Sequence, residues 1–173
     1  MLFLGAPFGL HAADSIQDVV DRTLIRELMD RYGVVHDSGS PEEYADLFTA
    51  DGEIAVAPGA PAIVKGREAL MAQARRDHER FGTEPAAGGG TTSIMRHLIS
   101  NSQITLTGAD TATGTCYVTT VVKKGDVGPA ILGISRYTDS YTKQDGKWRI
   151  KRREITTEFG NGELARQLGF GGG

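Results

Sequence analysis

The pattern of apolar positions in residues 15–48 predicts a long amphipathic helix followed by a second helix. Apolar side chains recur every three or four residues, which gives a helix of about five turns with one buried face. These positions are Ile16, Val20, Leu24, Ile25, Leu28, Met29, Tyr32 and Val35. Gly39 suits the end of the first helix, and Ser40-Pro41 suits the start of the second. We therefore expect the first helix to pack on a sheet.

The next segment alternates between a short strand, a helix and a loop. Residues 52–57 read as a strand, residues 58–61 as a turn, and residues 67–81 return to helical spacing. The glycine-rich stretch Gly82 to Thr92 is either a mobile flap beside a site or a plain surface connection.

From Ser93 onward the periodicity becomes that of strands. Asp145-Gly146, between two alternating runs, is a strong hairpin signal. Helices followed by an antiparallel meander predict an α+β domain, in which one curved antiparallel sheet wraps around the first helix. The expected strands are 94–107, 111–124, 130–143 and 147–157, followed by a short helix at 161–168.

Composition adds limits to this picture. A chain of 173 residues, 39% hydrophobic and 24% charged, is one globular domain that needs no disulfide or metal to fold. We divide it into an apolar arm (1–14), the domain (15–160) and a short helix with a glycine-rich tail (161–173). The net charge of -3 and the scattered basic residues argue against a nucleic-acid partner.

The arm is too short to span a bilayer and has no Lys or Arg before its apolar run. We therefore expect a cytoplasmic protein, with a secretory signal as the less favoured alternative. We expect the arm to pack on a neighbouring subunit or across the mouth of a pocket.

His97 is the first candidate for chemistry. Strand alternation places Met95, His97 and Ile99 on one face, which indicates an interior position. A single histidine on an apolar face is more often a core residue with one hydrogen bond. A partner changes that interpretation: if the first helix lies in the concavity of the sheet, its end carries Asp37 toward the sheet. A carboxylate there would hold the imidazole in one tautomer and strengthen it as a base.

Several segments together resemble a known family. RYGVVHDSGSPEEYADLF, GREAL, RHLISNSQITL and YTDSYTKQDGKWRI are similar to the SnoaL-like branch of the nuclear transport factor 2-like (NTF2-like, or cystatin-like) superfamily. The resemblance runs from about Ile16 to Thr157. It implies a cone-shaped α+β barrel with an apolar pocket at its open end, assembled as a homo-oligomer, either a dimer or a trimer.

The resemblance also implies roles for individual residues. Scytalone dehydratase, hexachlorocyclohexane dehydrochlorinase and the bile-acid 7-alpha-dehydratase have an Asp that matches Asp37, and the first two have a His that matches His97. In the dehydrochlorinase an Arg that receives the leaving anion matches Arg153, and a pocket Tyr matches Tyr137. A helix Tyr of the bile-acid enzyme matches Tyr32.

Three departures accompany this match. Val56 replaces a strand tyrosine of the dehydratases, Thr120 replaces an acid of the bile-acid enzyme, and the second histidine of scytalone dehydratase has no counterpart. Strict alternation from Trp148 places Arg152, not Arg153, on the face of the tryptophan. Arg153 points into the pocket only if a bulge intervenes or the tryptophan faces away; otherwise it lies on a solvated edge.

The predicted function is that of a cofactor-independent lyase. His97, oriented by Asp37, would take a proton; Tyr32 or Tyr137 would donate to the departing or developing oxygen; Arg153 would steady negative charge. Dehydration and retro-aldol carbon-carbon cleavage both fit, on a small, apolar, hydroxylated aromatic or polycyclic substrate. The expected pocket residues are Leu28, Met29, Met71, Met95, Val118, Thr120, Ile155 and Phe159.

No cofactor or metal is predicted. His36 and Asp37 are adjacent, which is not a ligand spacing, and we expect His78 on a solvated helix face. Gly88-Gly89-Gly90 lacks the context of a phosphate loop, and Cys116 reads as a packing residue. Two alternatives stay open. One is a non-catalytic ligand-binding or assembly subunit, like the small subunits of ring-hydroxylating dioxygenases; the other is an isomerase, cyclase or epoxide hydrolase.

Overall fold

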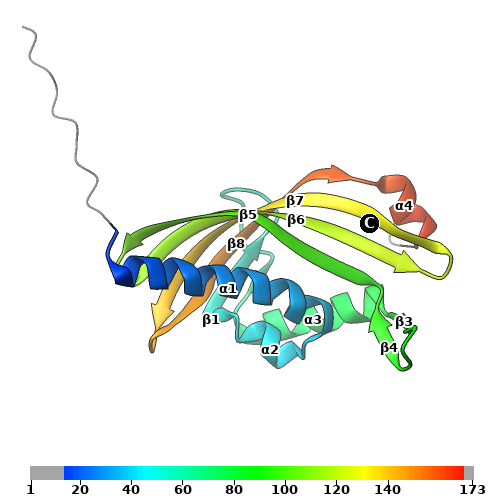
Figure 1. The fold of residues 1–173 in the computed structure, drawn as a ribbon, viewed down its shortest axis with the longest axis horizontal. Helices are drawn as coiled ribbons and strands as arrows, with labels where there is room; N and C mark the ends of the chain where they lie inside the picture. Colours follow the sequence, from blue (N-terminus) through cyan, green and yellow to red (C-terminus); the bar gives the residue numbers. More distant parts are fainter. Residues whose placement is uncertain (1–13, 170–173) are drawn as a thin grey trace, which may run out of the picture.

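The protein folds as an α+β domain in which a curved sheet lies over the helices (Figure 1). The computed structural model describes residues 14–169. The helices are α1 (Ile16–Ser38), α2 (Pro41–Ala45), α3 (Arg67–Phe81) and α4 (Gly162–Gln167). The strands are β1 (Phe48–Ala55), β2 (Val64–Lys65), β3 (Thr83–Pro85), β4 (Thr91–Ser93), β5 (Met95–Gly108), β6 (Thr111–Lys124), β7 (Val127–Gln144) and β8 (Lys147–Gly160).

The main sheet has the strand order β2-β1-β8-β7-β6-β5 and is mixed, whereas the sequence predicted a purely antiparallel one. The exception is β1, which runs parallel to β8, with Phe48 opposite Ile150. The chain leaves α2 at the end of the sheet where β8 begins, so β1 enters in the same direction as β8. Strand β1 also begins four residues earlier than predicted, and the two-residue edge strand β2 was not predicted.

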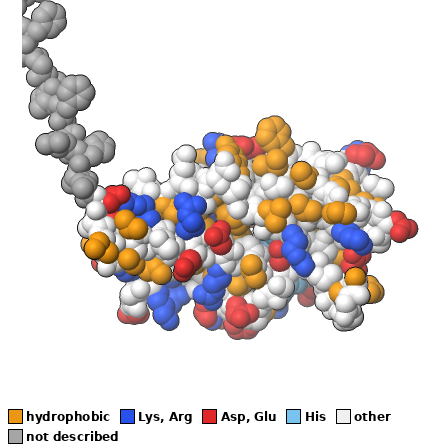
Figure 2. Space-filling model, viewed as in Figure 1, with side chains coloured by type: hydrophobic (Ala, Val, Ile, Leu, Met, Phe, Trp, Pro, Cys, Tyr) orange, Lys and Arg blue, Asp and Glu red, His pale blue; other side chains and the backbone are white. Residues whose placement is uncertain are grey.

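Helix α1 lies in the concavity of the sheet, as its apolar periodicity predicted. Ile25, Met29 and Tyr32 are almost fully buried against the sheet. The beginning of the helix differs from the expectation, because Ile16 is 86% exposed and Val20 is 42% exposed. The first buried position of α1 is Asp21, which accepts hydrogen bonds from the ends of β7 and β8, so the turn before it lies beyond the sheet. Orange side chains therefore lie on the surface at the start of α1 (Figure 2).

A glycine allows the end of α1 to approach β5 closely. A side-chain Cβ at Gly33 would lie 2.8 Å from the carbonyl oxygen of His97. Only a residue without a side chain permits this separation. On β5, Met95 and His97 alternate with the exposed Arg96 and Leu98, which confirms the predicted face. The last turn of α1 is thus held directly over the inner face of β5.

The hairpin between β7 and β8 confirms the turn signal, and a bulge in β8 settles the direction of Arg153. Asp145 and Gly146 both have positive φ angles, 51° and 73°. Ser140 pairs with Arg152 and Tyr141 with Ile150, which leaves Lys151 as an extra residue. Trp148, Ile150 and Arg153 can therefore all be buried on one side of the strand.

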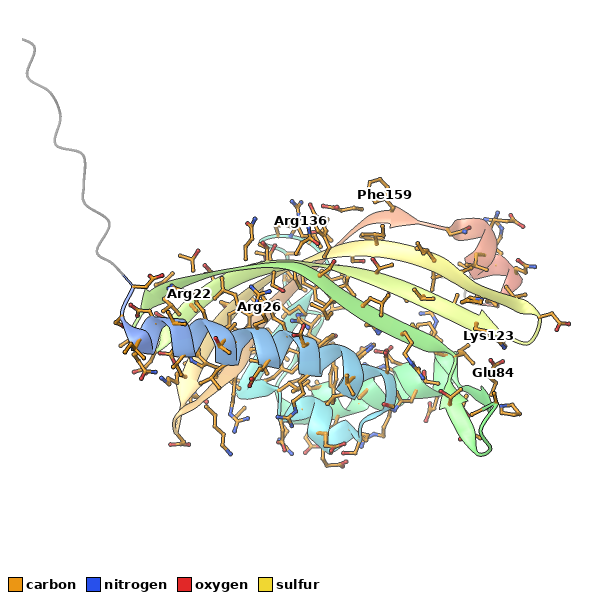
Figure 3. All side chains as sticks on the ribbon, in the orientation of Figure 1. Arg22, Arg26, Glu84, Lys123, Arg136 and Phe159 are labelled. Carbon is orange, nitrogen blue, oxygen red and sulfur yellow. The ribbon has the colours of Figure 1, made fainter. Side chains whose placement is uncertain are left out.

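The glycine-rich stretch after α3 forms a small hairpin of β3 and β4 rather than an irregular loop. Glu84 of this hairpin accepts hydrogen bonds from the side chain of Lys123 (2.9 Å) and from the backbone of Gly125 (2.8 Å) (Figure 3). The predicted helix near the C-terminus is α4. The predicted arm falls almost entirely outside the described residues, and so do the last four residues of the tail. Within residues 14–169, no helix combines the length and apolar character needed to cross a membrane.

Candidate functional site

The end of α1 and the start of β5 bring Asp37 and His97 into direct contact. Asp37 Oδ1 lies 2.6 Å from His97 Nδ1, and Asp37 Oδ2 accepts a 2.9 Å hydrogen bond from the backbone N–H of His97. Both side chains are more than nine-tenths buried. The second ring nitrogen, Nε2, has no hydrogen-bond partner within residues 14–169. A carboxylate at Nδ1 favours the tautomer with the proton on Nδ1, which leaves the lone pair of Nε2 free.

His36 is a third member of the site that the sequence reasoning missed. Its Nδ1 lies 3.2 Å from His97 Nδ1, and its Nε2 lies 3.1 Å from Asp77 Oδ2. The ring stacks on Tyr32, with centroids 5.4 Å apart and planes 9° apart. Burial lowers the pKa of His36, and this effect outweighs the opposite influence of Asp77. His36 is therefore a neutral imidazole at neutral pH.

Asp77 and Gln73 of α3 complete the network. Gln73 Nε2 donates to both carboxylate oxygens of Asp77 at 2.8 Å. Burial alone would raise the pKa of Asp77, but the hydrogen bonds from His36 and Gln73 outweigh it and the pKa is lowered. His78, expected on a solvated face, instead contacts the carbonyl oxygen of His36 through Nε2 at 2.9 Å. The sequence held one signal for the inward position of Asp77: residues 70, 74 and 77 follow helical spacing and so share one face of α3.

Two cavities meet at this network. The inner cavity has a volume of about 420 Å³ and the outer one about 480 Å³, and both are lined by His36, Asp77, Phe81 and Met95. His97 lines only the inner cavity, whereas Asp37 lines only the outer one. The imidazole thus faces a partly open cavity, whose wall includes residues of several strands. The other inner-cavity residues include Tyr32, Tyr44, Ile54, Val56, Ile63, Val64, Thr120, Leu132, Tyr137, Ile155 and Thr157.

Three phenols face the inner cavity beside the histidines. Tyr32 and Tyr137, both predicted site residues, lie with their rings 5.8 Å apart, and the Tyr32 hydroxyl is 3.2 Å from that of Tyr44. Burial raises the pKa of all three phenols, most strongly for Tyr44 and Tyr137. They are therefore protonated hydrogen-bond donors at neutral pH. Tyr44 was not among the predicted site residues.

Arg153 points inward but does not line either cavity. Its guanidinium donates to Asp139 through Nε (2.9 Å) and Nη2 (2.6 Å), and it lies over the rings of Tyr32 (3.9 Å) and Tyr137 (4.4 Å). Burial disfavours the cation, but the Asp139 carboxylate outweighs this and holds the pKa of Arg153 well above its usual value. Its charge is thus balanced by Asp139 behind the cavity wall. This position differs from the expected contact with a leaving anion.

The predicted pocket residues divide into two groups. Met95, Thr120 and Ile155 line the inner cavity. Phe159 is 67% exposed and points outward (Figure 3), because a second bulge at Glu158 reverses the side of the strand on which it lies. The remaining four do not line this cavity: Leu28, Met29 and Val118 are buried in the hydrophobic core, and Met71, partly buried, packs against it.

Donor atoms of His36, Asp37 and His97 lie within 4.8 Å of one another, a grouping that could hold a metal ion. The spacing of His36 and Asp37 in sequence did not indicate this, because the third donor comes from β5. The 2.6 Å contact of Asp37 with His97 already places the Nδ1 proton between them. A metal ion at this point would have to replace that proton.

Comparison with known proteins agrees with the fold. An NTF2-like protein with a cystatin-like fold from Novosphingobium aromaticivorans is 27% identical, with a TM-score of 0.64 over 91% of this chain and 98% of that one. A proposed scytalone dehydratase from the same organism is 29% identical, with a TM-score of 0.64 over 82% and 86%. LinA is 19% identical, with a TM-score of 0.66 over 84% and 91%, a likeness that shows the fold alone.

No curated protein matches the sequence. The family described as the SnoaL-like domain matches residues 17–154, which include every element from α1 to most of β8. The helix that carries Asp37 in its last turn, the strand that begins with Met95 and most of the curved sheet lie within this match. The chain belongs to the SnoaL-like family, within the NTF2-like fold.

Proposed function

We propose that this protein is a cofactor-independent lyase in which His97 is the general base. One observation carries the proposal: a buried Asp37–His97 pair leaves Nε2 of the imidazole without a protein partner at the wall of a cavity of about 420 Å³. A base needs an unprotonated nitrogen within reach of its substrate and little competing water. The second cavity beside the pair would serve as the route of entry for the substrate.

The elimination uses only side chains of this chain. His97 Nε2 takes a proton from a carbon next to a carbonyl group or, in the retro-aldol case, from a hydroxyl. In dehydration the electrons of the broken C–H bond form a carbon-carbon double bond, and the hydroxyl leaves as water with a proton from a phenol. Tyr137 and Tyr32 are the donors for this step, because burial keeps them protonated. The proton held by the imidazolium then returns to the phenolate.

The size and lining of the inner cavity support the substrate class. Its volume lies within the range of about 300–1,000 Å³ that is usual for small-molecule sites. Apolar side chains such as Ile54, Leu132 and Ile155 share the wall with a few polar groups. A small hydroxylated aromatic or polycyclic compound suits this combination. The similarity to a proposed scytalone dehydratase favours water loss over carbon-carbon cleavage.

A screen of hydroxylated aromatic and polycyclic compounds, without added cofactor, tests the proposal. We expect turnover by the wild type and a loss of about 10²- to 10⁴-fold in kcat for His97→Gln, the usual contribution of a general base. Glu79→Gln, an exposed change on α3, is the matched control and should keep full activity. Activity that survives His97→Gln would reject the lyase mechanism.

A second candidate function is a ligand-binding or assembly subunit, and the exposed apolar start of α1 favours it. Ile16 and Val19 are more than half exposed, a feature that often marks an interface. A homo-oligomer, either a dimer or a trimer, would cover this surface, and light scattering of the purified protein measures its mass. Stoichiometric co-purification with a larger catalytic subunit, together with intact ligand affinity in His97→Gln, would support the subunit instead of the lyase.

A further inference from the structure

We propose that His36 and Asp77 form a second histidine–carboxylate pair that positions His97 by fixing its tautomer. The network runs from Gln73 through Asp77 and His36 to His97, with contacts of 2.8, 3.1 and 3.2 Å. Its use in catalysis rests on the proposed function of His97 as a base. Its effect on the tautomer exists in the free protein, and so it has a test of its own.

The first step is the tautomer of His36. A carboxylate only accepts hydrogen bonds, so His36 Nε2, at 3.1 Å from Asp77 Oδ2, must donate. Gln73 holds the carboxylate in place by donating to both of its oxygens. His36 Nδ1 faces His97 Nδ1, whose proton lies toward Asp37, so the single proton of the His36 ring is on Nε2; burial, which lowers the pKa of His36, agrees with this. The Nδ1 atom of His36 therefore presents a lone pair.

The second step is the effect of this tautomer on the position of the proton in His97. The two Nδ1 atoms are 3.2 Å apart, and since that of His36 is an acceptor, that of His97 must be the donor. Asp37 Oδ1 is a second acceptor of the same proton, at 2.6 Å. Two independent acceptors thus require the proton at Nδ1 of His97. Each of them leaves Nε2 free to act on a substrate in the inner cavity.

His36 lines both cavities, but both of its ring nitrogens are directed at other side chains, so it acts through His97 rather than on the substrate. Both of its ring nitrogens are occupied, one by Asp77 and one by His97. The ring packs against the phenol rings of Tyr32 and Tyr44, with both centroids at 5.4 Å. His36 is accordingly a positioning residue. The titratable groups that face it are Asp37 from its own helix, Asp77 and His78 from α3, His97 from β5, and the phenols Tyr32 and Tyr44.

The arrangement also affects the state after proton abstraction. When His97 holds a second proton, its Nδ1–H keeps both acceptors, one charged and one neutral. A neutral His36 stabilises this imidazolium, whereas a protonated His36 would repel it. Asp77 therefore supports catalysis by keeping the proton of His36 on the far nitrogen. Replacing it should lower kcat more than it changes KM.

Nitrogen-15 NMR of protein labelled at histidine tests the proposal directly. In the wild type we expect His97 to carry its proton on Nδ1 and His36 on Nε2. Asp77→Asn and His36→Leu should each reduce the ratio of the Nδ1–H to the Nε2–H form of His97 by about 5-fold, the factor for loss of one net hydrogen bond. Glu79→Gln, on the same helix as Asp77 and exposed, should leave the ratio unchanged.

Three results would overturn the proposal: an unchanged ratio in both variants, a wild-type His36 protonated on Nδ1, or a stoichiometric metal ion bound to the purified protein through His36 and His97. Asp77→Asn is nearly isosteric, so it keeps the test valid if His36→Leu fails to fold. The measurement uses no substrate. A lyase proposal that fails for want of turnover therefore leaves this result intact, and an unchanged tautomer ratio leaves turnover to be judged by His97→Gln.

Discussion

Two buried carboxylates, Asp139 and Asp37, each contact a nitrogen-containing side chain. The two pairs differ in whether that side chain keeps a nitrogen available for a substrate. Asp139 accepts two hydrogen bonds from Arg153 and a third from the Tyr141 hydroxyl at 2.7 Å. Arg153 stays protonated and lies behind the cavity wall. Asp37 instead holds an imidazole that can gain or lose a proton and lines the inner cavity. A buried ionic pair is suited to chemistry only when its base can change state next to a space for a substrate.

The largest effect on folding should come from breaking the buried Asp139–Arg153 pair. Asp139→Ala leaves the fully buried Arg153 cation without a partner, so the free energy of unfolding should fall by about 3–5 kcal/mol. Chemical denaturation measures this change. Asp30→Ala, at an exposed position of α1, is the control and should stay within about 0.5 kcal/mol. A loss below about 1 kcal/mol for Asp139→Ala would contradict the structural role of this pair.

The corresponding change in the Asp37–His97 pair should reduce activity more than stability. Asp37→Asn keeps the shape of the side chain but weakens two hydrogen bonds, so we expect a smaller loss of about 1–3 kcal/mol in the free energy of unfolding. Turnover of a substrate found in the screen should fall by at least about 10²-fold. Denaturation and steady-state kinetics on one preparation give both values. Equal activity in Asp37→Asn and the wild type would remove the distinction between the pairs.

Gly33→Ala tests whether the close approach of α1 to β5 brings Asp37 and His97 together. The new Cβ would meet the carbonyl oxygen of His97 at 2.8 Å, so α1 must move away from β5. We expect a loss of about 1–3 kcal/mol, as for other overpacked sites, and reduced turnover because Asp37 no longer reaches His97. A crystal structure of the variant measures the shift. Unchanged stability and activity would show that the close approach is unimportant.

The smallest expected effect is a dependence of stability on pH. The folded protein lowers the pKa of His36 below its ordinary value of 6.5, so the unfolded chain binds this proton more readily. The contribution of His36 is fully present above pH 6.5 and is lost as the pH falls below it. Denaturation at a series of pH values should show this decline in the wild type and less of it in His36→Leu. A decline of the same size in both proteins would contradict a buried neutral His36.

Much of the fold was predictable because its helices, strands and turns follow from sequence patterns that span only a few residues. The periodicity of α1, the alternation on β5 and the Asp145-Gly146 turn each depend on residues close in sequence. The meeting of Asp37 with His97 followed from two such elements, since a helix end and a strand face can be placed together once the architecture is known. The resemblance to the SnoaL-like family extended this to residues far apart in the chain.

The parts that were not predicted depend on contacts or irregularities without a local signature. The bulges at Lys151 and Glu158 turn Arg153 inward and Phe159 outward, yet neither residue type marks a bulge. His36 was overlooked because its partner Asp77 comes from α3, and the packing of α3 on α1 is a tertiary event. The exposed start of α1 likewise depends on where the sheet ends rather than on the helix itself.

The most direct test of the central claim is a crystal structure of the protein with a substrate or product in the inner cavity. We expect His97 Nε2 to lie about 2.6–3.2 Å from the substrate carbon or hydroxyl oxygen that gives up its proton, or to reach that atom through one water molecule. We also expect Asp37 to keep its contact with Nδ1. A ligand that fills the cavity but leaves Nε2 without any contact, or a His97 ring turned away from Asp37, would contradict the account.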